Sequence, residues 1–163
     1  MDDFERYVEV YSTDLMRFCY KLCGSLYDAE DLFQDTWTKA LHKLHTYDSD
    51  RDFRTWLFSI CVNTYRDSGR KKYNSMKFHF QNNEEKERFL HSIPTEEKNI
   101  DEYIDLYSAI ATLSKKHRLV ITLYYFKEFS VKEIAEILSI PEGTVHSRLN
   151  TAKRMLKRRL SDA

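Results

Sequence analysis

The chain contains very few residues that interrupt a helix, with only 3 glycines and 2 prolines among its 163 residues. An all-β fold needs such residues in the turns between its many short strands, so their scarcity argues against one. Hydrophobic residues make up 42% of the chain and aromatic residues 14%, which is enough for packed cores and unlike a disordered chain. We therefore expect an all-α fold of long helices joined by short polar connections.

Apolar residues recur at steps of three and four through the N-terminal part of the chain. This spacing predicts amphipathic helices over residues 3–23, from position 28 to about Leu44, and from about Phe53 to Arg70. Gly24 is expected to end the first helix, and Asp28 is expected to cap the second. Three helices of this kind would pack together as a small bundle.

The periodicity disappears over residues 73–100, which are rich in polar and acidic side chains and include Pro94. Helical spacing resumes beyond this stretch and continues almost to the end of the chain. We therefore predict two small helical domains, residues 1–72 and residues 101–163, joined by a flexible acidic linker over residues 73–100.

The net charge of zero hides four blocks of alternating sign. Residues 1–50 carry 5 basic and 11 acidic side chains (−6), residues 51–77 carry 7 and 2 (+5), residues 78–105 carry 3 and 8 (−5), and residues 106–163 carry 11 and 5 (+6). This layout suits a protein that touches nucleic acid at two places and a basic partner elsewhere. Ordinary solvated helix surfaces explain the charges equally well, so charge alone leaves both interpretations open.

A helix-turn-helix is predicted near the C-terminus. Ser130 and Glu133 form a capping-box pattern, in which each side chain satisfies a free backbone N–H group at the start of a short helix. The turn Ser139–Gly143 leads to a last helix that runs to about Leu160. Ala135 is small where the two helices must cross closely. Two helices joined by a tight turn are common, so the outer surface must decide what this unit binds.

The last helix has a basic outer face. Val145, Leu149 and Ala152 mark its buried side, and no acidic side chain occurs between Thr144 and Ser161. Short polar side chains near the helix start can reach base edges in the major groove, while later Arg and Lys residues meet phosphates. A solvated helix, or one that packs on a protein, is the alternative interpretation. The predicted DNA contacts are Thr144, His146, Ser147, Arg148, Asn150, Thr151, Lys153 and Arg154.

No motif in the sequence points to catalysis. There is no phosphate-cradling glycine loop, nucleophile motif or metal-ligand cluster, and the 6 histidines are scattered. We therefore expect no catalytic residue, no metal site, no cofactor and no enzymatic activity. Cys19, Cys23 and Cys61 are expected to be buried apolar residues, although the one-turn spacing of the first two leaves redox sensing open.

The sequence carries no targeting or membrane signal. Met1 is followed by acidic residues rather than by a basic and then an apolar stretch, so no signal peptide is expected. No apolar run approaches the roughly 20 residues that a membrane helix needs. We therefore expect a cytoplasmic protein.

Three stretches resemble motifs of the extracytoplasmic-function (ECF) group of bacterial sigma factors, within the sigma-70 family. Asp28–Asp35 resembles the polymerase-binding helix of this group, and Phe53–Arg70, which begins FRTWLF, resembles its −10 promoter-binding helix. Ser130–Leu138 together with Pro141–Leu149 is similar to its C-terminal −35-binding motif. The motifs occur in the family's order and cover both predicted domains.

The resemblance implies core RNA polymerase as a partner, through its β′ coiled coil and its β flap. The helix that would dock on the coiled coil has an acidic outer face, which suits a partner rich in Arg. An alternative explanation for these acidic side chains is that the helix dipole stabilises carboxylates near the helix N-terminus. This accounts for Asp31 but not for Asp35, which lies further along the helix. The residues assigned to polymerase binding are Asp31, Gln34, Asp35 and Thr38.

The resemblance also implies that the third helix and the loop before it hold the −10 element as a melted single strand. Basic side chains can follow the phosphates, and an extruded base can be read in a small polar pocket. Trp56 lies on the inward side of the helix and is expected to be a core residue. The side chains assigned to the −10 element are Asn63, Arg66, Arg70 and Lys71, with the loop His45–Asp52.

Taken together, the resemblance implies an alternative sigma factor that directs promoter recognition and opening, with duplex DNA bound at −35 and single-stranded DNA at −10. An anti-sigma factor that covers the polymerase-binding surfaces is implied as a further partner. His146 and Asn150 depart from the larger or more basic residues of many relatives, so the −35 sequence stays open. The alternatives are a stand-alone regulator that dimerises and ignores polymerase, and a protein-only adaptor without salt-sensitive DNA affinity.

Overall fold

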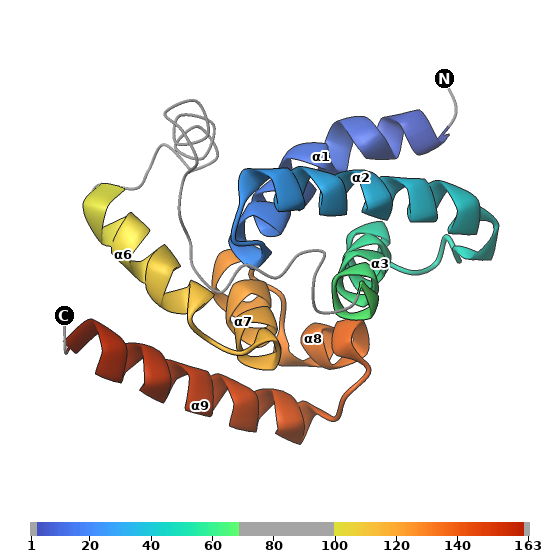
Figure 1. Ribbon diagram of the computed structural model, residues 1–163. Helices are drawn as coiled ribbons and strands as arrows, with labels where there is room; N and C mark the ends of the chain where they lie inside the picture. Colours follow the sequence, from blue (N-terminus) through green and yellow to red (C-terminus); the bar gives the residue numbers. More distant parts are fainter. Residues whose placement is uncertain (1–2, 69–99, 162–163) are drawn as a thin grey trace.

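The computed structural model describes the backbone of residues 3–68 and 100–161. Every regular element in these two ranges is helical, as the scarcity of glycine and proline predicts. The predicted linker, residues 73–100, falls outside the described residues except at its last position. The elements, coloured along the chain in Figure 1, are α1 (Asp3–Leu22), α2 (Leu26–Lys43), η1 (Leu44–Thr46), α3 (Phe53–Asp67), α6 (Ile100–Ala111), α7 (Lys115–Ile121), η2 (Thr122–Phe126), α8 (Val131–Leu138) and α9 (Glu142–Ser161).

The first three long helices form a bundle around a core of buried apolar side chains. α2 packs against both α1 and α3, and the side chains at the centre have no exposed surface. Burial of large apolar side chains stabilises such a bundle by about 1.5–3 kcal/mol for each of them. The largest fully buried apolar side chains here are Leu15, Phe18, Leu22, Leu32, Leu57 and Phe58.

Two of the predicted helix boundaries in this bundle are wrong. The Ser25 hydroxyl, not Asp28, caps α2, and it accepts a hydrogen bond from the Asp28 backbone N–H at 3.1 Å. Asp28 instead lies in the first turn, where the helix dipole favours a carboxylate. α3 ends at Asp67, earlier than the predicted end at Arg70.

The expectation that Trp56 is a core residue is only partly met. Its ring is partly buried and packs 5.0 Å from the ring of Tyr47, centroid to centroid. Phe53, on the inner side of the same helix, is buried and stacks on Tyr7 at 3.8 Å. Trp56 therefore packs at the edge of the core, beside the loop that precedes α3.

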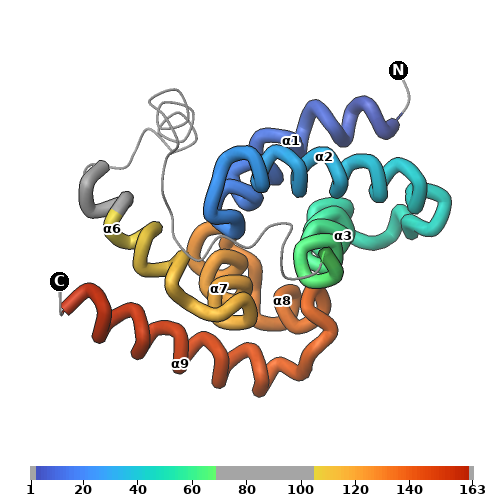
Figure 2. The backbone as a smooth tube through the Cα atoms, viewed as in Figure 1, coloured from blue at the N-terminus to red at the C-terminus, as the bar shows by residue number. Residues whose placement is uncertain are grey.

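The C-terminal elements form a second helical unit. α9 packs along α6 and α7, and α8 packs across its first turns (Figure 2). Leu123, Ile134 and Val145 are buried at the centre of this unit. The predicted capping box is confirmed, since the Ser130 hydroxyl accepts from the Glu133 N–H at 3.1 Å and the Glu133 carboxylate accepts from the Ser130 N–H at 3.2 Å.

The turn of the helix-turn-helix contains a left-handed residue. Ser139 ends α8 with φ 56° and ψ 47°, a conformation that side chains with a Cβ rarely adopt. The Ile140 N–H then donates to the Ala135 carbonyl at 3.0 Å, which closes the last turn of α8. The Pro141 carbonyl accepts from the backbone N–H groups of Thr144 and Val145, which starts α9.

Replacing Ser139 by glycine is expected to stabilise the helix-turn-helix. Glycine adopts the left-handed conformation without steric cost, although its freer unfolded chain offsets part of the gain. We expect Ser139→Gly to raise the free energy of unfolding by about 0.5 kcal/mol, measured by chemical denaturation. Ser139→Ala keeps the Cβ and is the control, so an equal gain in that variant would contradict the explanation.

The two helical units pack against each other, which the sequence did not predict. α8 lies against α3, and α1 contacts both η2 and α6. Figure 1 shows α7 and α8 beneath the bundle of α1, α2 and α3. The described residues of the two predicted helical domains therefore lie in contact with each other.

Candidate nucleic-acid interface

The outer side of α9 gathers the side chains predicted to bind the −35 element on one surface. Val145, Leu149 and Ala152 turn inward and are buried, which leaves the other sides of the helix facing solvent. Thr144, Arg148 and Thr151 lie at the edges and are partly buried. The exposed members of the predicted set are His146, Ser147, Asn150, Lys153 and Arg154.

Local contacts hold several of these side chains in place. The Arg154 guanidinium donates to the Thr151 hydroxyl at 3.4 Å, and the Ser147 hydroxyl donates to the Thr144 carbonyl at 3.4 Å. The Lys153 ammonium lies 5.4 Å above the ring centre of Tyr125 in η2. Hydrogen bonding to Tyr125 raises the pKa of Lys153, so this side chain stays cationic at physiological pH.

The side chains predicted to hold the −10 element are only partly placed by the structure. Asn63 and Arg66 lie one turn apart on the exposed side of α3, and the Arg66 guanidinium donates to the Asn63 amide oxygen at 2.9 Å. Burial lowers the pKa of Arg66, and the neighbouring Arg148 of α9 lowers it further. The other two members of this set, Arg70 and Lys71, lie outside the described residues.

A cavity of about 510 Å³ lies between α3 and α8. From the first unit it is lined by the end of the loop before α3 and by the helix itself, including Trp56, Ser59 and Asn63. From α8 it is lined by Glu133, Glu136 and neighbouring residues. The wall from the first unit thus carries an aromatic ring, polar groups and the Asp52 carboxylate, and the opposite wall carries the carboxylates of Glu133 and Glu136.

The predicted polymerase-binding residues share one side of α2. Gln34 and Thr38 are exposed, and Asp31 and Asp35 are partly buried. The inward side of this helix is formed by other residues, among them Leu32, Thr36 and Trp37. The Thr36 hydroxyl donates to the Leu32 carbonyl at 2.7 Å, so this buried hydroxyl has a partner within its own helix.

A buried arginine joins the two units and was not predicted from the sequence. The guanidinium of Arg118 in α7 donates to the Leu22 carbonyl at 3.1 Å and to the Tyr65 hydroxyl at 2.9 Å, both in the first unit. It also donates to the carbonyls of Ala111 and Leu113 in its own unit, at 2.8 and 2.9 Å. Only 4% of the Arg118 surface is exposed. The carbonyl of Leu22 ends α1, where the helix dipole favours a cation.

A second polar cluster joins the units around Asp14 of α1. Its carboxylate accepts from Lys127 at 2.8 Å and from Arg54 at 2.7 Å, and the Arg54 guanidinium also donates to the Lys127 carbonyl at 2.8 Å. Arg54 further lies 4.1 Å above the ring centre of Phe129, across the same boundary. Basic residues in a helical protein usually face solvent. The sequence pattern alone therefore does not predict that basic side chains form this cluster between the units.

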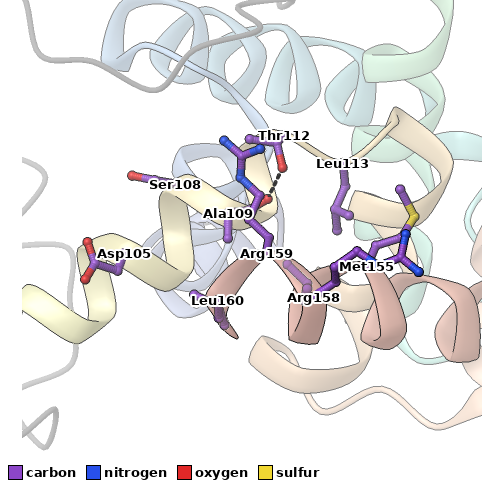
Figure 3. A pocket seen from close by; sticks show the side chains of 10 residues that line it. Asp105, Ser108, Ala109, Thr112, Leu113, Met155, Arg158, Arg159 and Leu160 are labelled. Atoms are coloured by element: carbon purple, nitrogen blue, oxygen red, sulfur yellow. Dashed lines mark hydrogen bonds between the residues drawn. The ribbon is translucent and has the colours of Figure 1, made fainter. Parts of the chain in front are cut away.

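A pocket of the second unit lies between α6 and α9, far along α9 from the helix-turn-helix turn. It measures about 700 Å³ and is lined by Asp105, Ser108 and Thr112 on one side and by Met155, Arg158 and Arg159 on the other (Figure 3). None of the side chains predicted to bind the −35 element lines it. The pocket is therefore a separate feature of the C-terminal half of α9.

The three cysteines are buried thiols, as expected. The sulfur atoms of Cys19 and Cys61 lie 3.9 Å apart, and burial raises the pKa of Cys19 and Cys23 well above the ordinary value. Thiols in this state are poor nucleophiles. Within the described residues there is no cluster of three or more His, Cys, Asp or Glu side chains suited to a metal ion. None of the helices described is both long and apolar enough to cross a membrane.

Two family models match the chain, one for each unit. Sigma-70 region 2 matches residues 7–74, and sigma-70 region 4 matches residues 103–156. The first match includes α2 and α3, with the side chains assigned to polymerase and to the −10 element. The second includes the helix-turn-helix. Sigma factors of this family are not enzymes.

Relatives match the chain over nearly its whole length. The ECF RNA polymerase sigma factor SigW of Bacillus subtilis is 30% identical, over 99% of this chain and 90% of SigW. The ECF RNA polymerase sigma factor SigL of Mycobacterium tuberculosis is 33% identical, over 91% of this chain and 83% of SigL. The sigma factor RpoE of Bartonella quintana, solved in complex with the anti-sigma factor NepR, matches with a TM-score of 0.77 and 25% identity, over 99% of this chain and 98% of RpoE. The chain therefore belongs to the ECF RNA polymerase sigma factors of the sigma-70 family, and it is an alternative sigma factor that directs promoter recognition.

Proposed function

We propose that this sigma factor binds a promoter at two elements, −10 and −35, while one helix docks on core RNA polymerase. The observation that carries the proposal is the outer side of α9, which beyond Glu142 is exposed, basic and free of carboxylates, behind a fully formed helix-turn-helix. The working units are residues 1–72 for polymerase and −10 binding, residues 73–100 as an acidic linker, and residues 101–163 for −35 binding.

In this proposal α9 enters the major groove of the −35 duplex. Short polar side chains in the first half of α9 are assigned to base edges, and mainly basic side chains are assigned to phosphates. Thr144, His146, Ser147 and Asn150 belong to the first group. Arg148, Lys153 and Arg154 belong to the second group, together with Thr151, whose neutral hydroxyl can donate to a phosphate oxygen. The exposure of His146, Ser147 and Asn150 supports the assignment, because base contacts need side chains that no neighbour covers.

Removing one phosphate contact should change the salt dependence of DNA binding. We expect Arg154→Ala to weaken binding to any duplex and to reduce the slope of log K against log salt concentration by about 1, because one fewer counterion is released. The measurement is fluorescence anisotropy on a random-sequence duplex at several salt concentrations. Lys132→Ala, an exposed cation of α8 outside the proposed surface, is the control. An equal slope change in both variants would remove Arg154 from the interface.

The −10 strand is assigned to the outer side of α3 and the residues after it. Asn63 and Trp56 line one wall of the cavity of about 510 Å³, and polar and aromatic side chains of this kind can contact an unpaired base. Arg66, Arg70 and Lys71 would follow the phosphates. The cavity wall supplied by α8 must move away before a strand enters, since carboxylates repel phosphates.

Polymerase is assigned to the outer side of α2. Asp31, Gln34, Asp35 and Thr38 would meet the β′ coiled coil, and the second unit would meet the β flap. Because RpoE of Bartonella quintana is solved with an anti-sigma factor, we also propose a protein of this kind as a regulatory partner. The chain is proposed to act in the cytoplasm, without a cofactor and without catalytic activity of its own.

In-vitro transcription tests the proposal as a whole. Purified core polymerase with this protein, on fragments of the genome that encodes it, should start transcripts at a defined set of promoters. A stand-alone regulator would instead bind duplex DNA tightly and leave core polymerase unaffected. Absence of new start sites, together with absence of co-purification with core polymerase, would reject the polymerase assignment.

A further inference from the structure

The second unit contains an apolar pocket that the proposed binding of the −35 element does not use. The pocket measures about 310 Å³ and lies where α6, the end of α7, η2 and α9 meet. This volume is at the small end of the range of about 300–1,000 Å³ in which proteins bind small molecules. The pocket shares Leu156 with the larger one in Figure 3. Its apolar and aromatic walls are formed by Leu106, Ile110, Ile121, Tyr125, Phe126 and Leu156.

Most of these walls are poor partners for water. Ile110 and Ile121 each expose 2% of their surface, and Leu106, Phe126 and Leu156 are partly buried. None of these five side chains can donate or accept a hydrogen bond. Water in the pocket therefore lacks hydrogen-bond partners on these sides, and an apolar group that displaces it gains free energy. The walls thus favour an occupant with an apolar body.

The wall from η2 is a π-helical turn. The Lys127 N–H donates to the Thr122 carbonyl, five positions earlier, at 3.2 Å. Glu128, directly after this turn, has a φ of 58°, which is uncommon for a residue other than glycine. The turn carries two exposed tyrosines, Tyr124 and Tyr125, with 37% and 48% of their surface accessible. Since π-helical turns and strained backbone are frequent at functional sites, the backbone independently marks the place where the pocket lies.

One charged residue, Lys153 of α9, lines the described part of the pocket. It lies one turn before Leu156, is exposed, and holds its ammonium 5.4 Å above the ring centre of Tyr125. No acidic side chain is among the described residues that line the pocket, and α9 carries none between Thr144 and Ser161. The potential beside Lys153 is therefore positive, and the Tyr125 hydroxyl can donate to an anion there. An apolar occupant fits best if it carries one negative charge at this end.

We propose that this pocket binds a small organic anion, a carboxylate on an apolar body, and that its carboxylate pairs with Lys153 and withdraws this cation from the −35 duplex. The effect on DNA rests on the proposed role of Lys153 in phosphate binding, whereas binding of the anion does not. The ligand weakens the grip on phosphates without touching the side chains assigned to base edges. Because such coupling is reciprocal, duplex DNA weakens binding of the anion by the same factor.

Decanoate is the probe for this site, and decan-1-ol is its neutral counterpart. The methyl NMR signals of Ile110 and Ile121 should shift on titration, whereas those of Ile134, buried in α8 outside the pocket, should not. We expect the ratio of the affinity for decanoate to that for decan-1-ol to fall roughly 3- to 5-fold in Lys153→Gln, because an exposed ion pair is lost. Lys157→Gln, which removes an exposed cation of α9 outside the described lining, is the matched control and should keep the ratio of the parent.

Binding of decanoate should also change how α9 meets DNA. At constant total ionic strength, saturating decanoate should weaken binding to a random-sequence duplex and reduce the slope of log K against log salt concentration by about 1, because one fewer counterion is released. Decan-1-ol should leave the slope unchanged. Leu106→Trp fills the pocket from α6, so this variant should bind the duplex as the parent does and should not respond to decanoate. Circular dichroism checks that its helices remain.

Three results would overturn the ligand site. Neither probe shifts the signals of Ile110 and Ile121, or Lys153→Gln keeps the ratio of the parent, which would mean apolar binding only. In the third, core polymerase shifts these signals and the probes do not, which would assign the pocket to a polymerase segment.

Failure of the proposed −35 role has a different signature. In that case the parent chain does not bind the duplex without decanoate, although the affinity ratio still depends on Lys153. If decanoate binds through Lys153 and leaves the salt slope unchanged, the effect on DNA is overturned. The slope of Lys153→Gln without ligand then shows whether Lys153 contacts a phosphate at all.

Discussion

Asp35→Arg is expected to abolish transcription by this sigma factor while leaving its fold intact. The side chain is partly exposed on the outer side of α2, away from the buried residues Leu32, Thr36 and Trp37. Like charges brought together at an interface cost several kcal/mol, which corresponds to a loss of roughly 100-fold or more in affinity for an Arg-rich partner. The measurements are co-purification with core polymerase and in-vitro transcription.

The control for this variant is Glu9→Arg. Glu9 is exposed on α1, outside the proposed polymerase face, and its reversal changes the net charge by the same amount. We expect Glu9→Arg to retain polymerase binding and Asp35→Arg to retain duplex binding through α9. Loss of duplex binding in Asp35→Arg would indicate a folding defect, and retention of transcription would remove Asp35 from the polymerase interface.

Arg118→Met should produce the largest loss of stability among single substitutions at the boundary of the two units. The substitution leaves three carbonyls and the Tyr65 hydroxyl without their donor in a buried site. Hydrogen bonds to charged groups contribute about 1.5–3 kcal/mol each, but carbonyls relax toward water when a partner is lost. We therefore expect the free energy of unfolding to fall by about 3 kcal/mol, measured by urea denaturation. Lys116→Met, at an exposed neighbouring position, should have little effect.

A Tyr65 variant measures how much of this loss of stability comes from hydrogen bonds between the two units. Tyr65→Phe removes the hydroxyl that accepts from Arg118 and donates to the Leu22 carbonyl. In a double-mutant cycle the two substitutions should couple by about 1 kcal/mol or more, because they share one hydrogen-bond network. Additive effects would mean that Arg118 acts only through Ala111 and Leu113 in its own unit.

The same tyrosine should make the structure sensitive to strong alkali. Burial raises the pKa of Tyr65 to about 12, although Arg118 acts in the opposite direction. The neutral phenol is favoured in the folded protein, so its contribution to stability is complete below pH 10, the ordinary pKa of tyrosine, and is lost as the pH rises to about 12. At physiological pH the Tyr65 phenol therefore stays neutral, and its hydrogen bond with Arg118 does not change with pH.

Local sequence signals predicted the helix-turn-helix well. The capping box of Ser130 and Glu133 and the inward stripe of α9 depend only on residues a few positions apart, so neighbouring side chains decide them. The start of α2 was missed although a local signal existed. Ser25 precedes Asp28 by three positions, which is the spacing at which a serine cap accepts from the backbone N–H of the first turn.

The contact between the units could not be predicted in this way. Asp14 and Lys127 are separated by more than a hundred positions, and each lies on a helix or turn where a charged side chain usually faces water. Trp56 shows the same limit on a smaller scale, because the position of Tyr47 in the preceding loop decides how much of its ring is covered. The contact between two helical units that are far apart in the sequence depends on the complementary shapes of their surfaces. The spacing of apolar residues within each helix does not encode these shapes.

The outer side of α3 contacts α8 and is also the surface proposed to bind the −10 strand, which has an evolutionary consequence. Arg66 donates to the Leu138 carbonyl at the end of α8 and is proposed to contact the −10 strand. A substitution that alters promoter preference at such a position also alters the contact between the two units. Promoter choice and the packing of the two units therefore cannot drift independently. A lineage that changes one must compensate on α8 to restore the other.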